Sequence, residues 1–420
     1  MPPGNDNNRL ALRTLLLLGL ATGFTACVEP IQSGGVVMYG GEGARVAAMC
    51  RFRRGAEGKA GFCAPEPEAP AAVTLARIEG DKKPFAGALV EAKAGDVLVD
   101  NGAIAAVISV SDGALVDAAD SEIREDALGR VGTCLGAPLG CLTGVTMTLS
   151  QGRDGSAQVL ARGHAEGDPR VTIATRYMLV PGARVILVST LIASKADEPL
   201  VIPSLGDAVH WGSAEPLPAI GNEPAPTTAA IAEAPFVAAL GTSVAYAIAP
   251  ADDRPTLEFE AVAGATSLRF GRNVTLPPGG SARYERLFVV APRGDTLGVV
   301  TELALVREAR VPGAIELRFV DEAGKPLPPP ADARVELLSP PRDTLVSFLR
   351  IGPSVAEAGV AAEAPPGAYE LDLRGKGLRA LARIPIEVKS GEVTQATITV
   401  GAEAAPVPAK GVPEGGTPAP

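Results

Sequence analysis

The chain has 420 residues, of which 46% are hydrophobic, 20% charged and only 4% aromatic. This composition is globular, and the length is sufficient for two or three folded units. The balance of 38 basic against 48 acidic residues gives a net charge of -10. That charge excludes the basic field of a nucleic-acid-binding protein, so we expect no nucleic-acid partner. The 48 glycines and 38 prolines favour many short strands joined by tight turns.

Residues 1–26 are predicted to be a bacterial export signal. Two arginines precede the apolar run 15–21, which is too short to span a bilayer. The following Phe-Thr-Ala-Cys resembles a lipobox, the lipoprotein signal in which the thiol of the first mature residue, here Cys27, is acylated. The resemblance implies an anchor in the cell envelope, and the valine after the cysteine favours the outer membrane, on its periplasmic or surface face. Phenylalanine replaces the usual lipobox leucine, so cleavage after Gly23 is the alternative.

Cysteine counting also favours lipidation, because the chain has five cysteines and an odd number leaves one unpaired. Without Cys27, an oxidising compartment would hold four disulfide-forming residues, which are Cys50, Cys63, Cys134 and Cys141. Pairing them in chain order closes two short loops, each contributing roughly 2 to 3 kcal/mol. The other two pairings remain open. A four-cysteine zinc site is the alternative, although neither spacing is the Cys-x-x-Cys of metal knuckles.

Two segments are predicted after the export signal, a tether and a large β-domain. Residues 27–71 are predicted to be a flexible tether with one disulfide loop, since they are Gly-rich and end in a Pro-Glu-Pro-Glu-Ala-Pro stretch that cannot join a sheet. From 72 to 310 we predict a large antiparallel β-sandwich. Its strongest signal is Asn101-Gly102 between two apolar runs, a pair that supplies the positive φ angles of a two-residue hairpin. Pro181-Gly182 and the Pro-Pro-Gly-Gly at 277–280 mark further strand pairs.

A single short helix is predicted over 295–310, with Asp295 or Thr296 as its cap. Its apolar stripe consists of Leu297, Val300, Ala304 and Leu305.

Residues 311–401 show short alternating strands separated by turns, which predict a small second β-sandwich. The tail 402–420 is Pro, Ala and Gly without an apolar period, so it is expected to be disordered. The predicted fold class is therefore all-β.

Residues 311–401 also resemble a known family. Gly-Lys-Pro-Leu-Pro at 324–328, together with Pro-Pro-Gly-Ala-Tyr-Glu-Leu at 365–371, is similar to the carboxypeptidase regulatory-like, or transthyretin-like, β-sandwich, an Ig-like arrangement. Proline and glycine make the turn, and Tyr369 begins a strand with its ring packed inward. The resemblance implies an accessory module without carboxypeptidase activity.

The middle region resembles the β-rich segment that precedes the metal site in large exported proteins with a polymerase-and-histidinol-phosphatase type metallohydrolase domain. The similarity rests on Gly-Asp-Val-Leu-Val-Asp-Asn-Gly at 95–102 and Leu-Gly-Asp-Ala at 205–208. No histidine-rich catalytic domain follows in this sequence, so the resemblance implies the accessory half of an enzyme architecture.

Candidate chemistry is concentrated at 207–212. The chain has no GxSxG, Walker or HExxH motif. Asp207, His210 and the sole tryptophan, Trp211, lie close together in sequence. One hypothesis makes Trp211 a stacking platform, with the acid and the histidine as partners for a glycan hydroxyl or an ion. The alternative is structural: Trp211 closes the end of the sandwich and His210 is hydrogen bonded.

Two other features are weighed in the same way. The second histidine, His164, is expected at a solvated strand end rather than beside a catalytic carboxylate. An acidic run could bind calcium through oxygen ligands, but it lacks EF-hand spacing, so we expect a solvated loop. Its members are Asp112, Asp117, Asp120, Glu122, Glu125 and Asp126.

We therefore expect a non-catalytic envelope lipoprotein that binds or scaffolds another component, with no cofactor and no metal. Its expected partners are the membrane, through lipid at Cys27, and an envelope protein or glycan. The alternatives are a carbohydrate-binding module, the accessory subunit of a hydrolase, or a cryptic hydrolase using Asp207 and His210 as general acid and base. Two histidines are too few for a multi-histidine metal centre.

Overall fold

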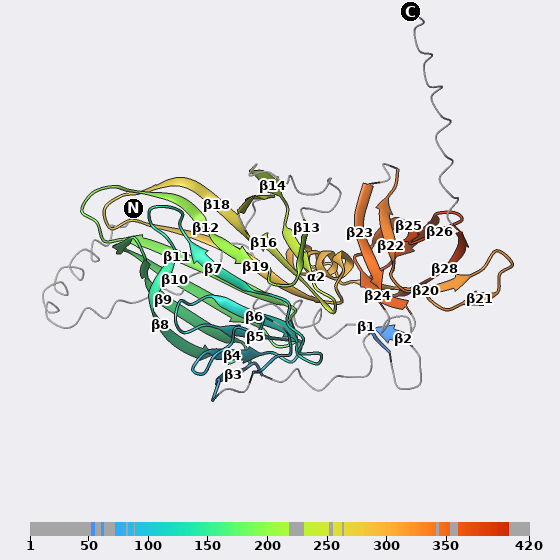
Figure 1. The fold of residues 1–420 in the computed structure, drawn as a ribbon, viewed down its shortest axis with the longest axis horizontal. Coiled ribbons are helices and arrows are strands. Elements are labelled where there is room, and N and C mark those ends of the chain that lie inside the picture. The colour runs from blue at the N-terminus through green and yellow to red at the C-terminus, as the bar shows by residue number, and fades with distance from the viewer. Residues whose placement is uncertain are drawn as a thin grey trace, which may run out of the picture. The chain divides into compact units, whose positions relative to one another are not determined.

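A computed structural model describes residues 52–54, 60–62, 72–80, 83–87, 89–217, 231–251, 255–262, 264–341, 344–352 and 360–402. This part of the chain is built from strands and one helix, as predicted (Figure 1). The export signal, Cys27, Cys50, Cys63 and the tail from 403 lie outside the described residues. No helix of the described ranges is long and apolar enough to cross a membrane.

Two large sheets make up most of the structure. The eight-stranded sheet has the order β13-β15-β16-β19-β11-β10-β9-β8. Its strands are β8 (Leu142–Gln151), β9 (Ala157–Ala165), β10 (Asp168–Leu179), β11 (Val185–Ser194), β13 (Glu215–Leu217), β15 (Val237–Leu240), β16 (Val244–Pro250) and β19 (Ser281–Pro292). The nine-stranded sheet has the order β14-β17-β18-β12-β7-β6-β5-β4-β3. Its strands are β3 (Thr74–Arg77), β4 (Val97–Asp100), β5 (Ile104–Ile108), β6 (Leu115–Asp120), β7 (Arg130–Cys134), β12 (Leu200–His210), β14 (Ala232–Ala234), β17 (Leu257–Val262) and β18 (Ala265–Leu276).

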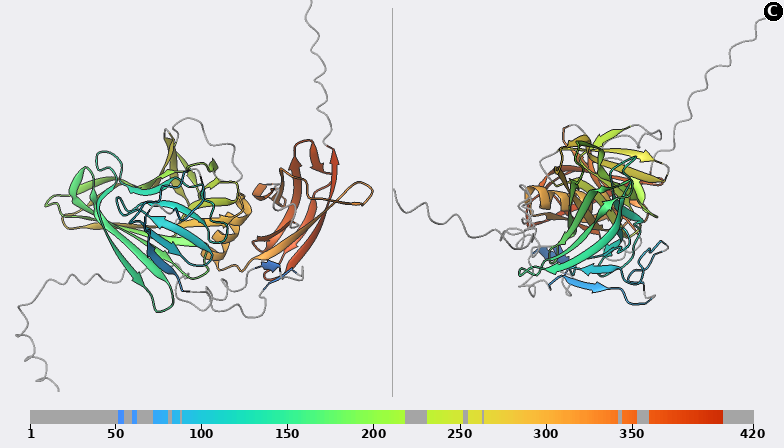
Figure 2. Two further views of the ribbon diagram at one scale, coloured as in Figure 1. Left: turned by 60° about the horizontal axis from the view of Figure 1, so that its bottom comes forward. Right: turned by 90° about the vertical axis from the view of Figure 1, so that its left-hand side faces the viewer.

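The two sheets face each other across one hydrophobic core, so they form the predicted antiparallel sandwich (Figure 2). Strict alternation decides which side chains enter this core. On β10, for example, Val171, Ile173, Thr175 and Tyr177 are buried, and the three residues that alternate with them are only half-buried. Burial of one face of each sheet therefore holds the sandwich together.

Two of the three predicted hairpins form, β4–β5 and β10–β11. The prediction at 277–280 is wrong: this turn carries the chain from β18 of the nine-stranded sheet to β19 of the eight-stranded sheet, because each strand buries its apolar face on the shared core and pairs with other neighbours. The first turn also differs in detail. Gly102 has a φ of +84°, whereas Asn101 is not among the residues with positive φ. The Asn101 side chain is buried instead: its Nδ2 donates to Val180 O at 2.8 Å and to Ala183 O at 2.6 Å. Its Oδ1 accepts the backbone N–H of Ala103 and of Ile104. Asn101 thus joins the β4–β5 turn to the turn between β10 and β11, and this tertiary contact fixes its backbone conformation.

The helix α2 (Thr296–Glu308) lies within the predicted range, and its cap is Asp295, whose Oδ1 accepts the N–H of Gly298 at 3.0 Å. The predicted single apolar stripe is incomplete. Leu297 belongs to the hydrophobic cluster of the C-terminal sandwich, whereas Val299 and Leu303 belong to a cluster on the outer face of the eight-stranded sheet. The helix is therefore buried on more than one side, so a single apolar stripe does not include all of its buried residues.

The C-terminal strands form the predicted second sandwich around their own core. These strands are β20 (Gly313–Val320), β21 (Pro326–Leu327), β22 (Ala333–Ser339), β23 (Thr344–Ile351), β24 (Val360–Ala364), β25 (Gly367–Gly375), β26 (Leu378–Ala380), β27 (Ile384–Val388) and β28 (Val393–Ala402). Most pairs are antiparallel, but β20 and β28 pair in parallel. As predicted, Tyr369 opens β25 with its ring buried, and its hydroxyl donates to Pro365 O at 3.0 Å. A further pair, β1 (Phe52–Arg54) and β2 (Ala60–Phe62), is antiparallel.

Candidate functional site

The three residues predicted as a candidate ligand site do not come together. Asp207 and His210 lie at the end of β12 and Trp211 directly follows it, and alternation sends Asp207 and Trp211 into the core and His210 to the outside. The Asp207 side chain is 0% exposed, whereas His210 is an exposed residue in register with Arg130 on β7. Asp207 and His210 therefore face opposite sides of the sheet, and they cannot act on one substrate as general acid and base.

Trp211 is part of the core rather than a surface platform. The residue is only 5% exposed, and its indole Nε1 donates to Thr266 Oγ1 on β18 at 2.9 Å. Behind it, Gly212 has a φ of +66°, and a Cβ there would lie 2.6 Å from Ala127 O. This close approach lets the chain turn tightly as it leaves β12. The structural interpretation of Trp211, as a plug of the sandwich, is the one that its burial supports.

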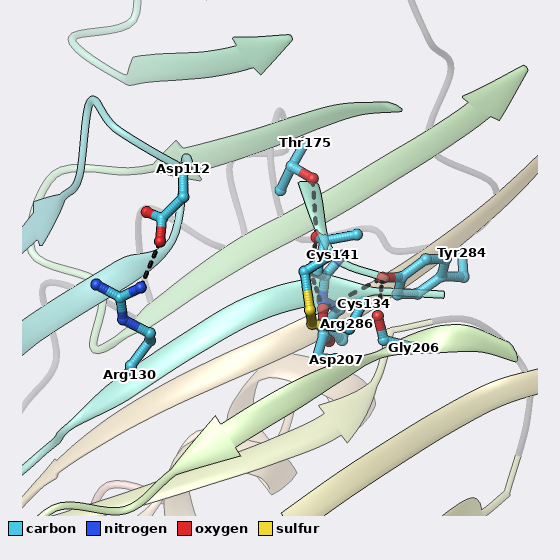
Figure 3. The surroundings of a disulfide bond; sticks show 10 residues. Asp112, Arg130, Cys134, Cys141, Thr175, Gly206, Asp207, Tyr284 and Arg286 are labelled. Atoms are coloured by element: carbon cyan, nitrogen blue, oxygen red, sulfur yellow. Dashed lines mark hydrogen bonds and ion pairs between the residues drawn. A yellow bond between two sulfur atoms is a disulfide. The ribbon is translucent and has the colours of Figure 1, made fainter. Parts of the chain in front are cut away.

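Asp207 is the centre of a buried polar network that joins the two sheets (Figure 3). Its Oδ1 contacts Nη2 of Arg286, on β19 of the opposite sheet, at 2.6 Å. Tyr284 donates from its hydroxyl to Gly206 O at 2.7 Å and to Asp207 Oδ1 at 3.2 Å. The Arg286 guanidinium lies over the Tyr284 ring, 4.6 Å from its centroid. An ion pair between fully buried groups thus connects β12 to β19.

Three threonine hydroxyls surround this ion pair. Arg286 Nη1 donates to Thr190 Oγ1 at 2.6 Å, and its Nη2 donates to Thr133 Oγ1 at 3.3 Å. Thr175 Oγ1 lies 2.9 Å from that of Thr133 and 3.1 Å from that of Thr190. Asp207 Oδ2 and Arg286 Nε have no hydrogen-bond partner among the described residues. Most polar atoms of the network therefore form hydrogen bonds with other members of the network.

The charges in this network depend on one another. Burial raises the pKa of Asp207, and the Arg286 guanidinium beside it opposes that effect. Burial likewise disfavours the charge of Arg286, but the carboxylate prevails and raises the pKa of the guanidinium above its ordinary value. Because a guanidinium stays protonated at any physiological pH and lies 2.6 Å away, it holds Asp207 in the ionised form at neutral pH. Removing either charge would leave the other buried and uncompensated.

The acidic run is not a solvated loop. Asp117 is 0% exposed, Asp126 3% and Asp120 6%, so the prediction of solvation is wrong for these three. Asp120 pairs with Arg184 at 2.7 Å. Asp112 and Glu125 contact Arg130 and Ser243, respectively. The described residues contain no group of three or more acidic, histidine or cysteine side chains arranged to hold a metal.

Asp117 and Asp126 form a buried carboxyl pair. Both oxygens of Asp117 accept backbone N–H groups, from Glu91 at 2.9 Å and Ala92 at 2.8 Å. Asp126 Oδ1 accepts from Ala118, and its Oδ2 has no partner among the described residues. Burial raises the pKa of Asp117 to about 7 and that of Asp126 to about 6, and the nearby charge of Asp126 adds to the effect on Asp117. The pair therefore retains protons at a pH at which exposed carboxyl groups are ionised.

Cys134 and Cys141 are joined by a disulfide, as predicted. The bond lies where the chain leaves β7 of the nine-stranded sheet and enters β8 of the eight-stranded sheet (Figure 3). Leu135 and Gly140 continue this tight connection with a backbone hydrogen bond of 2.8 Å. His164, at the end of β9, is half-buried, and its Nδ1 lies 3.0 Å from Ala165 O rather than beside a carboxylate.

The residues that sequence reasoning missed are those opposite Asp207. Arg286 and Tyr284 occupy β19 in the series Tyr-Glu-Arg-Leu-Phe, where a period of two places Tyr284, Arg286 and Phe288 on one face. Counting this alternation would have put an arginine at a core position. A buried arginine needs a buried acid, so the count would also have pointed to a carboxylate in the facing sheet.

Nearly all aromatic side chains whose burial is described are buried. Twelve aromatic residues have a described burial state, and all but Phe348 are buried. Phe348 is half-buried, with the Arg334 guanidinium 5.6 Å from its ring centroid. The buried ones are Phe85, Tyr177, Trp211, Phe236, Tyr246, Phe259, Phe270, Tyr284, Phe288, Phe319 and Tyr369. None of these twelve rings is therefore exposed for a sugar to stack on.

No family model matches the chain, and no curated protein matches it. Solved structures with a similar arrangement of strands are β-rich sandwich proteins. A TPR-domain containing protein from Parabacteroides distasonis is 9% identical, over 46% of each chain, with a TM-score of 0.36. A galactose mutarotase-like protein from Lactobacillus casei is 13% identical, over 47% of this chain and 100% of its own, with a TM-score of 0.32. An alpha-mannosidase from Enterococcus faecalis is 11% identical, over 50% of this chain and 31% of its own, with a TM-score of 0.35. TM-scores this low carry no argument about function.

Proposed function

We propose that this chain is a non-catalytic β-sandwich module of the bacterial cell envelope, tethered by lipid at Cys27, which binds or scaffolds another envelope protein. The observation that carries the proposal is the state of Asp207. This acid, the one that the sequence marks for chemistry, is sealed in the core against Arg286. A group with 0% exposure whose charge is neutralised at 2.6 Å serves to join two sheets, not to meet a substrate.

Two further observations support a protein partner over a glycan. Among the aromatic rings whose burial is described, none is exposed, and Trp211 is held in the core by its hydrogen bond to Thr266. A carbohydrate-binding module built on Trp211 would require the indole face to be open. This disfavours the glycan alternative at 207–211.

The resemblances of the sequence fit an accessory role. We propose that 311–401 is an accessory sandwich of the carboxypeptidase regulatory-like type, and that the region from about 75 to 310 is similar to the β-rich segment of exported metallohydrolases. The buried Tyr369 at the start of β25 and the turn before it support the first of these assignments. In this form of the proposal, the partner would be a hydrolase that the module positions.

The test uses the full chain, expressed with its own signal in a bacterial host, beside a Cys27→Ser variant. We expect the wild type in the membrane fraction with a mass increase at Cys27, and the variant released from the membrane. In-cell crosslinking followed by mass spectrometry should then give one envelope protein that is retained by the purified, folded chain. The proposal would be overturned if the wild type is cleaved but not acylated. It would also be overturned if the chain turns over a substrate and His210→Ala abolishes this activity without unfolding the protein.

A further inference from the structure

Three arginines lie close together on the outer face of the eight-stranded sheet. Arg162 is on β9, Arg176 on β10 and Arg283 on β19. Each alternates with a buried neighbour, Ala161, Tyr177 and Tyr284 respectively, which faces the core. The three cations therefore share the opposite, solvent-directed face, which we call the arginine face.

The strand register fixes how these arginines are spaced. Arg162 pairs with Ala174, which pairs with Leu191, which pairs with Arg283. Arg162 and Arg283 are thus the first and last residues of one row that crosses four adjacent strands. Three strand spacings of about 4.8 Å place their backbones about 14 Å apart. Arg176 pairs with Leu160, two residues from Arg162, so these two are diagonal neighbours at about 7 to 8 Å. An extended ligand lying across the strands could contact all three.

The arginine face carries an excess of positive charge on an acidic protein. The acid beside these arginines is Glu285, which forms an ion pair with Arg283, whereas Asp168 at the far end of β10 pairs with Arg170. Neither Arg162 nor Arg176 has an acidic partner among the described residues, although most other described strand arginines that face solvent pair with acids, as Arg269 and Arg272 do. Burial, and then the charge of Arg283, lowers the pKa of Arg176. The cations repel one another, so an anion bound there would relieve that repulsion.

The surroundings of the arginines are mostly aliphatic and partly exposed. Arg162 is exposed, and Leu160, Arg176 and Leu191 are half-buried. The helix α2 covers a different part of this outer face, where Leu287 and Val289 pack with Val299 and Leu303. Arginine beside aliphatic side chains, without an aromatic ring, is typical of a protein interface and not of a sugar platform.

We propose that the arginine face is a docking surface for an extended acidic segment of a partner protein. One carboxylate is held by Arg162 with Arg176 diagonal to it, the other by Arg283 beside its existing pair with Glu285, and an aliphatic side chain lies between them on Leu191. Alternate residues of an extended segment face the same way, and residues i and i+4 are about 14 Å apart. That spacing matches the row from Arg162 to Arg283. Arginine binds carboxylate through paired, charge-assisted hydrogen bonds, which provide the specificity. The inference deepens the proposed function by naming the surface and the chemistry of the partner.

The experiment uses a fluorescein-labelled peptide containing Glu-Ser-Leu-Ser-Glu and a peptide of the same composition in the order Glu-Glu-Leu-Ser-Ser. Fluorescence anisotropy with the purified full chain should show tighter binding of the first peptide, weakened by salt. The double variant Arg162→Gln/Arg176→Gln should weaken its binding by about tenfold. Arg318→Gln/Arg379→Gln, which removes two charges from exposed positions of β20 and β26, is the matched control and should leave binding unchanged.

Urea unfolding of the double variant checks that the sandwich stays intact, since both side chains lie on the outer face. Equal binding of the two peptides, no binding, or binding insensitive to the double variant would overturn the inference. Tighter binding of polygalacturonate or of phosphatidylglycerol vesicles than of the ordered peptide would also overturn it, because the ligand would then be a glycan or a lipid. A crosslinked envelope partner that still binds the double variant would leave the proposed function standing and refute only this surface.

Discussion

Replacing Arg286 with methionine should strongly destabilise the large sandwich. Methionine keeps much of the apolar volume but removes the charge that neutralises Asp207, which is 0% exposed and 2.6 Å away. Breaking a buried ion pair from one side costs about 3 to 5 kcal/mol, because the remaining charge has no counter-ion. The hydrogen bonds from Arg286 to Thr190 and Thr133 are lost as well. With a urea m-value of about 2 to 3 kcal/mol/M, the midpoint should fall by about 1 to 2 M.

The assay is urea unfolding followed by circular dichroism, applied to a double-mutant cycle. Arg286→Met and Asp207→Asn should each be strongly destabilising, whereas the double variant should lose much less than the sum of the two, because no uncompensated charge remains. Arg310→Met, which removes one partner of the exposed pair with Glu308, is the control and should move the midpoint little. Additive effects of the two core substitutions would refute the ion pair as the connection between the sheets.

Three further predictions concern other buried features. The raised pKa values of Asp117 and Asp126, about 7 and about 6 against an ordinary 3.8, mean that the folded state binds more protons than the unfolded state between about pH 4 and pH 7. The free energy of unfolding should therefore fall by about 3 kcal/mol from pH 5 to pH 7 and then level off. In Asp126→Asn the amide mimics the protonated acid. This variant should show a flatter pH profile and be more stable than the wild type at pH 8. Replacing Cys134 and Cys141 together with serine should cost about 2 kcal/mol in urea unfolding, because the disulfide closes a short loop. Trp211→Ala should cost about 3 to 5 kcal/mol by circular dichroism.

Each of these has an outcome that would contradict it. Stability that rises with pH between 5 and 7 would mean that the carboxyl pair is ionised in the folded state. An unchanged midpoint after loss of Cys134 and Cys141 would show that the crossover between the sheets is held by packing alone. A Trp211→Ala variant with wild-type stability would place the indole outside the core, and the glycan hypothesis would regain its platform.

The amino-acid sequence by itself determined the local structure of this protein. Alternation along 171–179 and 185–191, with Pro181-Gly182 between them, was sufficient to predict β10, β11 and their antiparallel hairpin. Asp295 as the cap of α2 and Tyr369 as the first inward ring of β25 were equally readable. These features are decided by a few neighbouring residues, because period, turn chemistry and capping act over short distances in the chain.

Only the tertiary structure decided what the polar residues do. Asp207 and His210 are three residues apart, yet alternation separates them, and the partner of Asp207 is 79 positions away in the facing sheet. Asp117 and Asp126 look like a solvated run in sequence, but the backbone of Glu91 and Ala92 covers Asp117. The reason is physical: the cost of burying a charge depends on which groups the fold brings within a few ångströms, and sequence distance carries no information about that.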